Sequence, residues 1–422
     1  MTQYPEMKEI AACRACGSAD LTEIVAFGDA PIADRLMRPE DTSVEYVAPL
    51  TLVHCEACAL CQIRETVAPR ILFGPDYPYF SSVSPALMKH FRSSAEALIK
   101  RRGLGPESLV MEAASNDGYM LLPFVEQGVP VLGVDPADGP VKVAREKGVD
   151  TVHDFFTHDL AQRLAAEGKR ADLFLANNVL AHVAETNDFV AGIATLLAED
   201  GMAVIECPYL LDLVAHGEFD TIYHQHLLYL SLTALVPLFA RHGLHLNDVE
   251  RLKIHGGSLR LFITREPGQS ETLRAHLEAE DALQASSSAF YADFTAKIAR
   301  MRDETRAAIT ALKAEGKRVA GYGAAAKATT LLHYFGLTAD DLDFIVDKST
   351  WKQGLEMPVT RIPIVPPEHL SRETADTVLI LAWNFANEIA RENTAFTDAG
   401  GTFLAPVPEL RVVGQTSEEV SL

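Results

Sequence analysis

The chain has 422 residues, which is too long for a single hydrophobic core and favours two or three domains. Its formal net charge of −21 argues against nucleic-acid and anionic-membrane partners, because both need a basic surface. No apolar run reaches the roughly 18 residues of a membrane span, and the N-terminal residues lack the basic and apolar regions of a signal peptide, so a cytoplasmic protein is expected.

Cysteines cluster near the N-terminus, where they form two CxxC pairs. The pairs are Cys13 with Cys16 and Cys55 with Cys58. Each pair places two thiolates on one side of a tight turn, and two such turns complete a tetrahedral zinc site. Reduced core cysteines would not need this spacing. We therefore predict a structural zinc in an N-terminal module of residues 1–75, with Cys61 and His54 as bystanders.

From about residue 105 the pattern alternates between strand and helix, which predicts a parallel sheet in a second domain of residues 76–250. The segments that carry this pattern are SLVMEAASNDGYMLLPF (108–124), VPVLGVDPAD (129–138), ADLFLANNVLAHV (171–183) and GMAVIECPYLL (201–211). The first of them contains a small-residue turn between its strand and its helix.

That turn reads EAASNDG and contains Glu112 and Asp117. Dinucleotide sites use GxGxxG at this place, and two carboxylates would repel a pyrophosphate. Asp135 ends the next strand, where an acid takes ribose hydroxyls. The combination favours S-adenosylmethionine, which carries sulfonium and ammonium charges, over NAD(P). A ligand-free α/β core is the remaining alternative.

Several motifs taken together resemble the sugar C-methyltransferases, which act on nucleotide-linked keto-deoxysugars. The motifs are the four-cysteine module, YPYFSSVS (77–84), EAASNDG (112–118), GVDP (133–136), DFF (154–156), ANNVLAHV (176–183), IYHQH (222–226), HGGS (255–258), GYGAAAK (321–327) and LAWN (381–384). The resemblance covers nearly the whole chain. It implies a class I methyltransferase core between the zinc-binding module and a second Rossmann-like domain.

The resemblance also implies a set of cofactor contacts. The set is Tyr77, Tyr79, Glu112, Ser115, Asn116, Asp117, Asp135, Pro136, Asp154, Phe155, Asn177 and Asn178. Residues of the first turn would line the sulfonium and methionine end, Asp135 the ribose, and Asp154 with Phe155 the adenine. The two asparagines would close the pocket. Ala114 stands where relatives often have Gly, so a slightly tighter turn is expected.

IYHQH interrupts an apolar run with four polar side chains, and its chemistry suits carbon methylation. A carbon next to a ketone becomes a nucleophile when a base removes its proton and a donor holds the enolate oxygen. Histidine is the natural base near neutral pH, and Tyr or His can be the donor. The predicted catalytic residues are His226, Tyr223 and His224 of this motif and His182 of ANNVLAHV, and the resemblance adds Tyr77.

The resemblance assigns the base to His226, places Tyr223 and His182 around the keto group, and folds Tyr77 and Tyr79 over the site. Gln225 is a departure, because a family member has Glu there, which puts a charged role in doubt. Histidines satisfied within the core are the alternative interpretation.

Residues 251–412 are predicted to form a third domain, with scaffold helices between 270 and 316 followed by a second α/β unit. GYGAAAK offers backbone N–H groups at a helix N-terminus, which suits a nucleotide-sugar diphosphate. The predicted substrate-binding residues are Gln225, His255, Tyr322, Lys327 and Asn384. A packing domain is the alternative. The polar tail 413–422 is expected to be disordered.

The sequence thus predicts an S-adenosylmethionine-dependent C-methyltransferase acting beside a ketone, at C-3 of a 4-keto sugar, on a nucleotide-linked deoxysugar. O- or N-methylation of a similar sugar, an NAD(P)-dependent sugar-modifying enzyme and a non-catalytic zinc-binding scaffold are the competing hypotheses. We expect a monomer without nucleic-acid or membrane partners.

Overall fold

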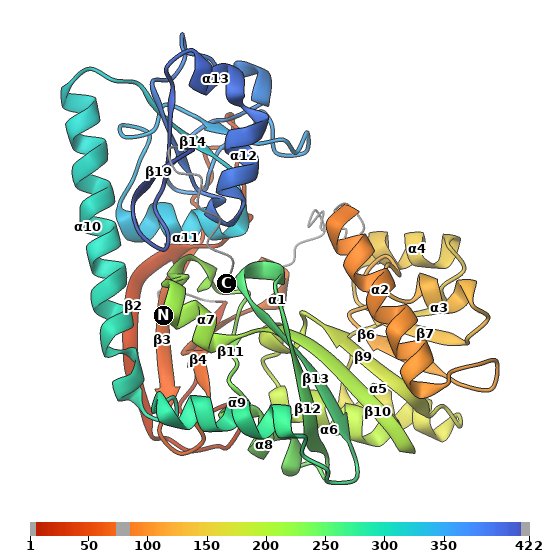
Figure 1. The fold of residues 1–422 in the computed structure, drawn as a ribbon. Helices are drawn as coiled ribbons and strands as arrows, with labels where there is room; N and C mark the ends of the chain where they lie inside the picture. Colours follow the sequence, from red (N-terminus) through yellow and green to blue (C-terminus); the bar gives the residue numbers. More distant parts are fainter. Residues whose placement is uncertain (1–5, 73–84, 415–422) are drawn as a thin grey trace.

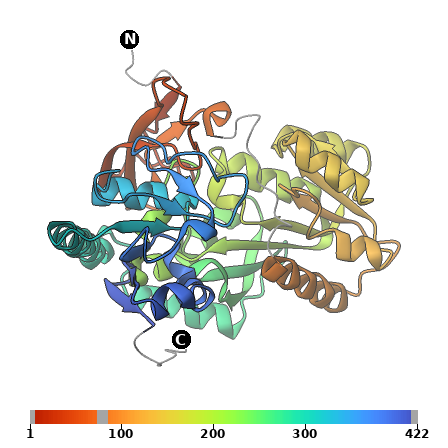
Figure 2. The same cartoon turned by 90° about the horizontal axis from the view of Figure 1, so that it is seen from above.

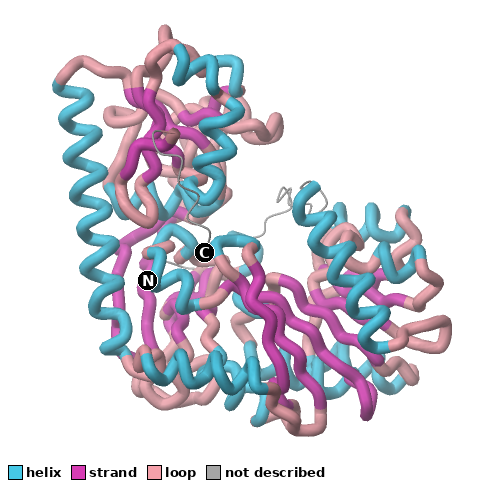
Figure 3. Tube along the Cα trace, viewed as in Figure 1, coloured by secondary structure: helices cyan, strands magenta, loops and turns pink. Residues whose placement is uncertain are grey.

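The computed structural model describes residues 6–72 and 85–414. The described strands form four sheets, of two, four, six and seven strands, and helices border the larger ones (Figure 3). Seen from above, the N-terminal and C-terminal domains share one side of the molecule, and the central sheet with its helices occupies the other (Figure 2). No helix in these described ranges is long and apolar enough to cross a membrane.

The N-terminal module contains β1 (Met7–Glu9), β2 (Leu21–Pro31), β3 (Val47–Cys55), β4 (Cys61–Ile63), β5 (Glu65–Val67) and α1 (Pro69–Leu72). The central domain contains α2 (Pro85–Arg102), β6 (Val110–Ala113), α3 (Leu122–Glu126), β7 (Val131–Asp135), α4 (Asp138–Glu146), β8 (Thr151–His153), α5 (His158–Ala166), β9 (Ala171–Asn177), η2 (Leu180–His182), α6 (Thr186–Leu196), β10 (Leu197–Pro208), α7 (Leu210–His216), η3 (Phe219–Thr221), β11 (Leu228–Tyr229), α8 (Leu232–Ala240), β12 (His245–Leu252), η4 (Ile254–Gly256) and β13 (Ser258–Thr264).

The remaining elements are α9 (Glu271–Ala282), η5 (Ser288–Tyr291), α10 (Ala292–Ala314), β14 (Val319–Tyr322), α11 (Ala326–Phe335), β15 (Ile345–Val346), β16 (Ile364–Val365), η6 (Pro367–His369), β17 (Thr377–Ile380), η7 (Trp383–Phe385), α12 (Ala386–Glu392), α13 (Thr394–Asp398), β18 (Thr402–Ala405) and β19 (Arg411–Val413). The long helix α10 contacts α11 and β14 of the C-terminal domain, and η5 before it contacts β2 of the N-terminal module (Figure 1).

The central sheet has seven strands in the order β12-β13-β10-β9-β6-β7-β8. Strands β8, β7, β6, β9 and β10 pair in parallel, which confirms the strand–helix alternation read from the sequence. β13 is antiparallel to both of its neighbours, β10 and β12. Because β13 spans Ser258–Thr264, the sheet extends past the expected domain boundary at residue 250. A hairpin that closes the edge of a parallel sheet gives no signal in the local strand–helix alternation.

The N-terminal module also recruits a strand from far along the chain. Its four-stranded sheet has the order β11-β4-β3-β2, and β11 (Leu228–Tyr229) follows the IYHQH motif directly. Leu228 pairs with Gln62 and Tyr229 with Cys61. The motif therefore lies where the zinc-binding module meets the central domain.

The C-terminal domain has a six-stranded sheet in the order β16-β15-β14-β17-β18-β19, with only the last pair antiparallel. This arrangement confirms the second α/β unit expected from KRVAGYGAAAK and the strands after it. The small residues of the turn are needed sterically, because a Cβ on Gly323 would lie 2.5 Å from the Cβ of Ala382.

The HGGS loop joins β12 to β13 and needs glycine at both central positions. A Cβ on Gly256 would lie 2.6 Å from Oε2 of Glu218, and one on Gly257 would lie 2.0 Å from Oδ2 of Asp212. Both glycines also have positive φ values, +87° and +127°, which other residues rarely adopt. The loop backbone thus packs directly against the segment that leads into IYHQH.

Gly257→Ala should lower the apparent melting temperature well beyond the effect of Gly103→Ala. Gly103, at φ +62°, has a left-handed value that costs about 1–2 kcal/mol for a residue with a Cβ, and nothing lies within 4 Å of its Cβ position. Gly257, at φ +127°, lies outside that region. The additional loss at Gly257 therefore measures its backbone strain together with its close contact with Asp212. Equal thermal shifts for the two variants would show that the loop can move away without cost.

Candidate active site

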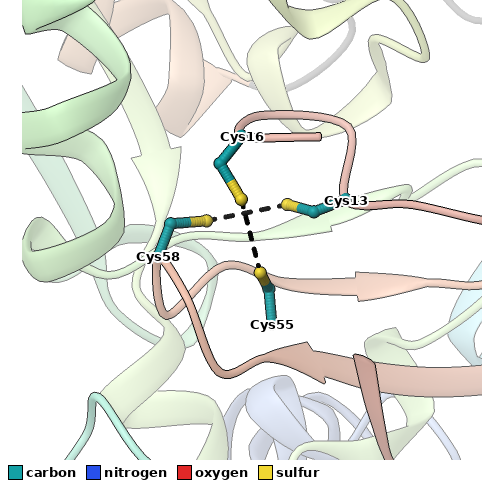
Figure 4. A group of neighbouring side chains, drawn as sticks. All are labelled: Cys13, Cys16, Cys55 and Cys58. Atoms are coloured by element: carbon teal, nitrogen blue, oxygen red, sulfur yellow. Dashed lines mark hydrogen bonds between the residues drawn. The ribbon is translucent and has the colours of Figure 1, made fainter. Parts of the chain in front are cut away.

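The four predicted zinc ligands come together, as Figure 4 shows. Their Sγ atoms all lie within 4.8 Å of one another, with Cys13–Cys58 at 3.6 Å and Cys16–Cys55 at 3.5 Å. Tetrahedral zinc with Zn–S bonds of about 2.3 Å needs S···S distances of about 3.8 Å, so the cluster fits this ion. Cys61 and His54 are outside the cluster, and His54 instead faces the carbonyl of Ser286.

The first CxxC turn also contacts the central domain. Asn187 on α6 donates from Nδ2 to the carbonyl oxygens of Arg14 and Ala15, at 2.8 and 3.0 Å. The side chain of Arg14 reaches back to the carbonyl oxygens of Ile63 and Glu65. A metal that fixes this turn would therefore also fix how the module docks, which is a structural role.

Glu112 and Asn177 lie side by side at the carboxyl end of the central sheet. The Asn177 amide donates to Oε1 of Glu112 at 2.9 Å, and only 1% of Glu112 is exposed. Burial raises the pKa of Glu112 to about 8, although the Asn177 hydrogen bond opposes this shift. Oε2 of Glu112 and Oδ1 of Asn178 have no hydrogen-bond partner among residues 6–72 and 85–414. Two orphaned acceptors at this edge suit a ligand rich in N–H donors.

Asp135 is already oriented by the backbone. Its Oδ2 accepts from the N–H of Asn116 at 2.9 Å and its Oδ1 from the N–H of Ala137 at 2.8 Å. Each oxygen keeps a lone pair for a further donor. The carboxylate is thus held at the end of β7 in the orientation that two vicinal hydroxyls require.

Two residues of the EAASNDG turn that are expected at the cofactor make contacts within the protein, and their cofactor roles stay predictions. Ser115 is fully buried, and its Oγ lies over Gly133 in the middle of β7. The Asp117 carboxylate pairs with Nζ of Lys147 at 2.9 Å. The backbone of the turn is unusual here, because Ala114 and Asn116 both have positive φ values, 56° and 49°. These left-handed residues change the directions in which the neighbouring side chains point. Ala114 thus occupies a conformation that favours Gly, which is a larger departure than a tighter turn.

The expected adenine contacts follow β8. Phe155 is 56% exposed, and Asp154 forms an exposed ion pair with Arg163 at 2.9 Å. The N–H of Asp154 donates to the carbonyl of Asp135, which joins this loop to the ribose acid. Pro136 accepts a hydrogen bond from His153 at its carbonyl. Tyr77 and Tyr79 lie outside the described residues.

His226 has a defined tautomer. Its Nδ1 lies 2.8 Å from the carbonyl oxygen of Thr221, which can only accept, so Nδ1 carries the proton. In the neutral ring Nε2 then holds the lone pair, and the Tyr223 hydroxyl donates to it at 2.9 Å. The ring centroids of Tyr223 and His226 are 4.0 Å apart. The motif therefore presents a basic nitrogen next to a phenol donor.

His182 lies against the same ring and is fixed in the same way. The ring centroids of His182 and His226 are 4.8 Å apart, and Nδ1 of His182 lies 2.7 Å from the Gln225 carbonyl. Burial lowers the pKa of His182, and the hydrogen bond to Gln225 offsets only part of this effect. A neutral His182 with Nδ1–H used in this bond offers Nε2 as an acceptor, not as a donor to an enolate oxygen.

The other two polar side chains of IYHQH point into the N-terminal module. Nε2 of His224 bonds to the carbonyl of Pro49 at 3.0 Å, and the Gln225 amide donates to the carbonyl of Ala33 at 2.9 Å. Burial lowers the pKa of His224 to about 4, so this ring is neutral. Both side chains thus contact the N-terminal module, and the catalytic role expected for His224 and the substrate-binding role expected for Gln225 stay predictions.

Lys327 and Asn384 meet in the C-terminal domain, where Lys327 donates to Oδ1 of Asn384. The ammonium also lies 4.0 Å from the ring centroid of Trp383. Tyr322 is 3% exposed at the end of β14. His255 lies in η4, and nothing is described of its side chain. The residues expected from GYGAAAK and LAWN are thus adjacent across two strand ends.

Asp347 directly follows β15 and was not predicted from the sequence. Its hydrogen bonds have the same arrangement as those of Asp135. Its Oδ2 accepts from the N–H of Ala324, in the turn after β14, and its Oδ1 from the N–H of Ser349, both at 2.8 Å. The same arrangement of turn and strand-terminal acid thus occurs in both α/β domains. An acid directly after an apolar strand, as in FIVDKS, was the signal that could have identified it.

Glu206 in β10 is a second buried acid that was not predicted from the sequence. It is 1% exposed, and it bonds to Nε of Arg260 at 2.8 Å and to Nε2 of His90 at 2.9 Å. Burial opposes its ionisation, but His90 and Arg260 outweigh this and hold the pKa of Glu206 below its usual value. A hollow of about 470 Å³ borders this cluster. Its lining is Lys89, His90, Ser93, Ser94, Leu252 and Arg260.

Three family profiles match successive parts of the chain. They are a putative zinc binding domain over residues 13–73, a methyltransferase domain over 88–249 and a C-methyltransferase C-terminal domain over 253–408. The last match includes β13, which pairs within the central sheet. These matches agree with the expected order of a zinc-binding module, a methyltransferase core and a second α/β domain.

One relative is similar over its whole length. C-methyltransferase NovU from Streptomyces niveus is 36% identical over 415 residues, which cover 97% of this chain and 99% of the relative. A ubiquinone biosynthesis O-methyltransferase from Azorhizobium caulinodans is 27% identical over 124 residues, 29% of this chain and 47% of that protein.

Solved structures of methyltransferases superpose on less than half of the chain. Magnesium protoporphyrin IX methyltransferase from Synechocystis PCC 6803 with bound SAH superposes with a TM-score of 0.35 and 17% identity, over 44% of this chain and 88% of that one. The CcbJ methyltransferase from Streptomyces caelestis superposes with a TM-score of 0.34 and 16% identity, over 43% and 90% of the two chains.

We expect one zinc per chain, held by the four-cysteine cluster. Cys13→Ser with Cys55→Ser removes one ligand from each pair and should abolish the metal and lower the melting temperature, because the module loses the ion that joins its two turns. Metal analysis of purified protein checks this. Cys207→Ala, a buried cysteine outside the cluster, should keep full zinc content. Retained zinc in the double variant would contradict the assignment.

Proposed function

The chain belongs to the C-methyltransferase family, and from that premise we propose that it transfers a methyl group from S-adenosylmethionine to the carbon next to a ketone in a nucleotide-linked deoxysugar. The family membership rests on the full-length relative and on the three successive profile matches. The base, the enolate and the sugar substrate form the proposal.

The observation that carries the proposal is the hydrogen-bonded pair of His226 and Tyr223. Carbon methylation next to a ketone needs a base with an exposed lone pair and a donor close to it. The carbonyl of Thr221 keeps the lone pair of His226 on Nε2, and the Tyr223 hydroxyl lies 2.9 Å from that nitrogen. A simple core histidine would not need its basic nitrogen matched to a phenol in this way.

The cofactor proposal is supported by the acceptor groups at the carboxyl edge of the central sheet, which match the donor groups of S-adenosylmethionine. The orphaned Oε2 of Glu112 and Oδ1 of Asn178 are acceptors for the ammonium group, and Asp135 is oriented for the ribose hydroxyls. When bound, S-adenosylmethionine supplies an electrophilic methyl group on its sulfonium. A pyrophosphate has no N–H donors and would meet the carboxylates of this edge, which argues against NAD(P).

In the proposed reaction, Nε2 of His226 takes the proton from the carbon next to the ketone. The C–H electrons would move into the enolate. The enolate carbon would then take the methyl group that S-adenosylmethionine supplies, with the carbon–sulfur electrons returning to sulfur. The base must first exchange its hydrogen bond with Tyr223 for the substrate, which frees the phenol to donate to the enolate oxygen. His182, neutral through burial, can accept from a sugar hydroxyl.

The C-terminal domain supplies the proposed nucleotide site. Lys327 offers a positive charge beside the glycine turn, where helix N–H groups favour a phosphate. Asp347 is oriented toward a ribose as Asp135 is in the central domain. The domain that would hold the nucleotide also contacts Ile222, the first residue of IYHQH, and Asp220 just before the motif.

Glu112 makes cofactor binding depend on pH. With a pKa of about 8 the carboxyl is largely protonated near neutral pH, and a cationic ligand favours the carboxylate, so binding should release a proton. Affinity should therefore rise between about pH 6 and pH 7.5. Glu112→Gln should lose this dependence and bind S-adenosylmethionine about 10- to 100-fold more weakly, as for a lost charged hydrogen bond.

Calorimetry in buffers of different ionisation enthalpy measures the released proton directly. The matched control is Glu126→Gln, an exposed acid paired with Arg92 on the protein surface. It should release the same proton and keep the wild-type affinity. Equal proton release from Glu112→Gln and wild type would assign the titration to another group.

His226→Asn should retain the fold and both ligands but lose about 10²- to 10⁴-fold in turnover, because the general base is gone. A panel of dTDP-, GDP- and CDP-linked keto-deoxysugars identifies the substrate first. In heavy water, with S-adenosylhomocysteine in place of the donor, wild type should wash deuterium into the carbon next to the ketone. That exchange should disappear in His226→Asn.

His276→Asn provides the control, since this ring bonds only to the carbonyl of Thr272 within its own helix among the contacts described. It should exchange and methylate like wild type. Exchange and methylation that persist in His226→Asn would transfer the role to His182. A product methylated on oxygen would leave a base at His226 but refute the enolate.

A further inference from the structure

The short segment 220–222 carries the carbonyl that orients His226, and the C-terminal domain holds it from both sides. Thr221 accepts from Nδ1 of His226 at 2.8 Å. Just before it, Oδ2 of Asp220 accepts from Nε1 of Trp383 at 2.6 Å. Just after it, the carbonyl of Ile222 accepts from Oγ1 of Thr330 at 3.0 Å. The residue that orients the base thus lies between two contacts from another domain.

These contacts are buried, which makes them strong geometric constraints. Asp220 and Ile222 are fully buried and Thr330 is 3% exposed. A buried carboxylate is costly unless it is hydrogen-bonded, so Asp220 holds Trp383 closely. Lys327, whose ammonium lies over the face of the same indole, favours the charged form of Asp220, although burial raises the pKa of Asp220 to about 6.

The same two elements carry the residues proposed for the nucleotide. Lys327 precedes Thr330 by three positions on α11, so the two side chains share one face of this helix. Asn384 directly follows Trp383 in η7 and accepts from Lys327. The elements that would hold the nucleotide, α11 and η7, are therefore also the elements that bind the segment 220–222 next to His226.

We propose that Asp220, Trp383 and Thr330 are positioning residues that set the orientation of His226 from the C-terminal domain. The inference rests on the proposed function. It implies that the domain does more than anchor the nucleotide, because the position of its α11 and η7 fixes the carbonyl to which the base is bound. Positioning errors of about 1 Å at a base typically cost about 10²-fold in rate.

Thr330→Val is the first test, because it removes the hydroxyl and keeps the shape of the side chain. We expect kcat and the deuterium exchange to fall about 10- to 100-fold, with KM for the nucleotide sugar and cofactor affinity unchanged. Thr330→Ser restores the hydroxyl and should recover most of the rate.

Thr329→Val is the matched control on the same helix. Thr329 is also 3% exposed, and its Oγ1 has no hydrogen-bond partner within the described ranges 6–72 and 85–414. It should leave both kcat and exchange at wild-type levels.

Trp383→Phe gives an independent test from the other side of the segment. The variant keeps an aromatic ring for Lys327 but lacks the N–H that Asp220 accepts, so kcat and exchange should fall as in Thr330→Val.

The outcomes separate this inference from the function on which it rests. Variants Thr330→Val and Trp383→Phe with wild-type kcat and exchange would overturn the inference alone. A fall in kcat accompanied by a comparable rise in KM, weaker cofactor binding and lower thermal stability would mean that the contacts only dock the domains. That result would overturn the inference too. A wild-type protein that neither exchanges nor methylates any of the sugars would overturn the proposed function and this inference together.

Discussion

The hydrogen bond from Nδ1 of His226 to the carbonyl of Thr221 is the interaction on which the arrangement of the site depends. It fixes the proton on one ring nitrogen and leaves the other as a base facing Tyr223. A backbone carbonyl can only do this if its own segment is rigid. The three domains supply that rigidity, because all of them contact residues 220–229.

The N-terminal module holds this segment through backbone-directed contacts rather than through chemistry of its own. His224 and Gln225 bond to carbonyl oxygens of Pro49 and Ala33, and β11 extends the sheet of β4 and β3. The four cysteines support the same segment, because a metal would stiffen the module that contacts one side of IYHQH. Asn187 ties the same metal-binding turn to the central domain.

The two α/β domains share one hydrogen-bond arrangement between a turn and a strand-terminal acid, but the side chains around it differ. In each, an acid at the end of the second strand accepts from the turn after the first strand and from the residue two positions on. The central turn adds buried carboxylates, which favour a cation, whereas the C-terminal turn adds Lys327, which favours an anion. The same backbone arrangement thus carries opposite charge in the two domains. IYHQH lies at the junction of the domains.

The sequence by itself determined the features that are encoded locally. CxxC spacing predicted the four-cysteine cluster, and strand–helix periodicity predicted both α/β domains. The acid after an apolar strand pointed to Asp135, whose role as the ribose ligand stays a prediction. Only the tertiary structure decided the features that depend on distant pairing. It placed β13 in the central sheet and β11 in the N-terminal sheet, directed Ser115 into the core, and turned His224 and Gln225 toward the N-terminal module. The pair of Asp220 and Trp383 joins residues 163 positions apart, and local patterns contain no trace of such contacts because the side chains meet only when whole domains pack.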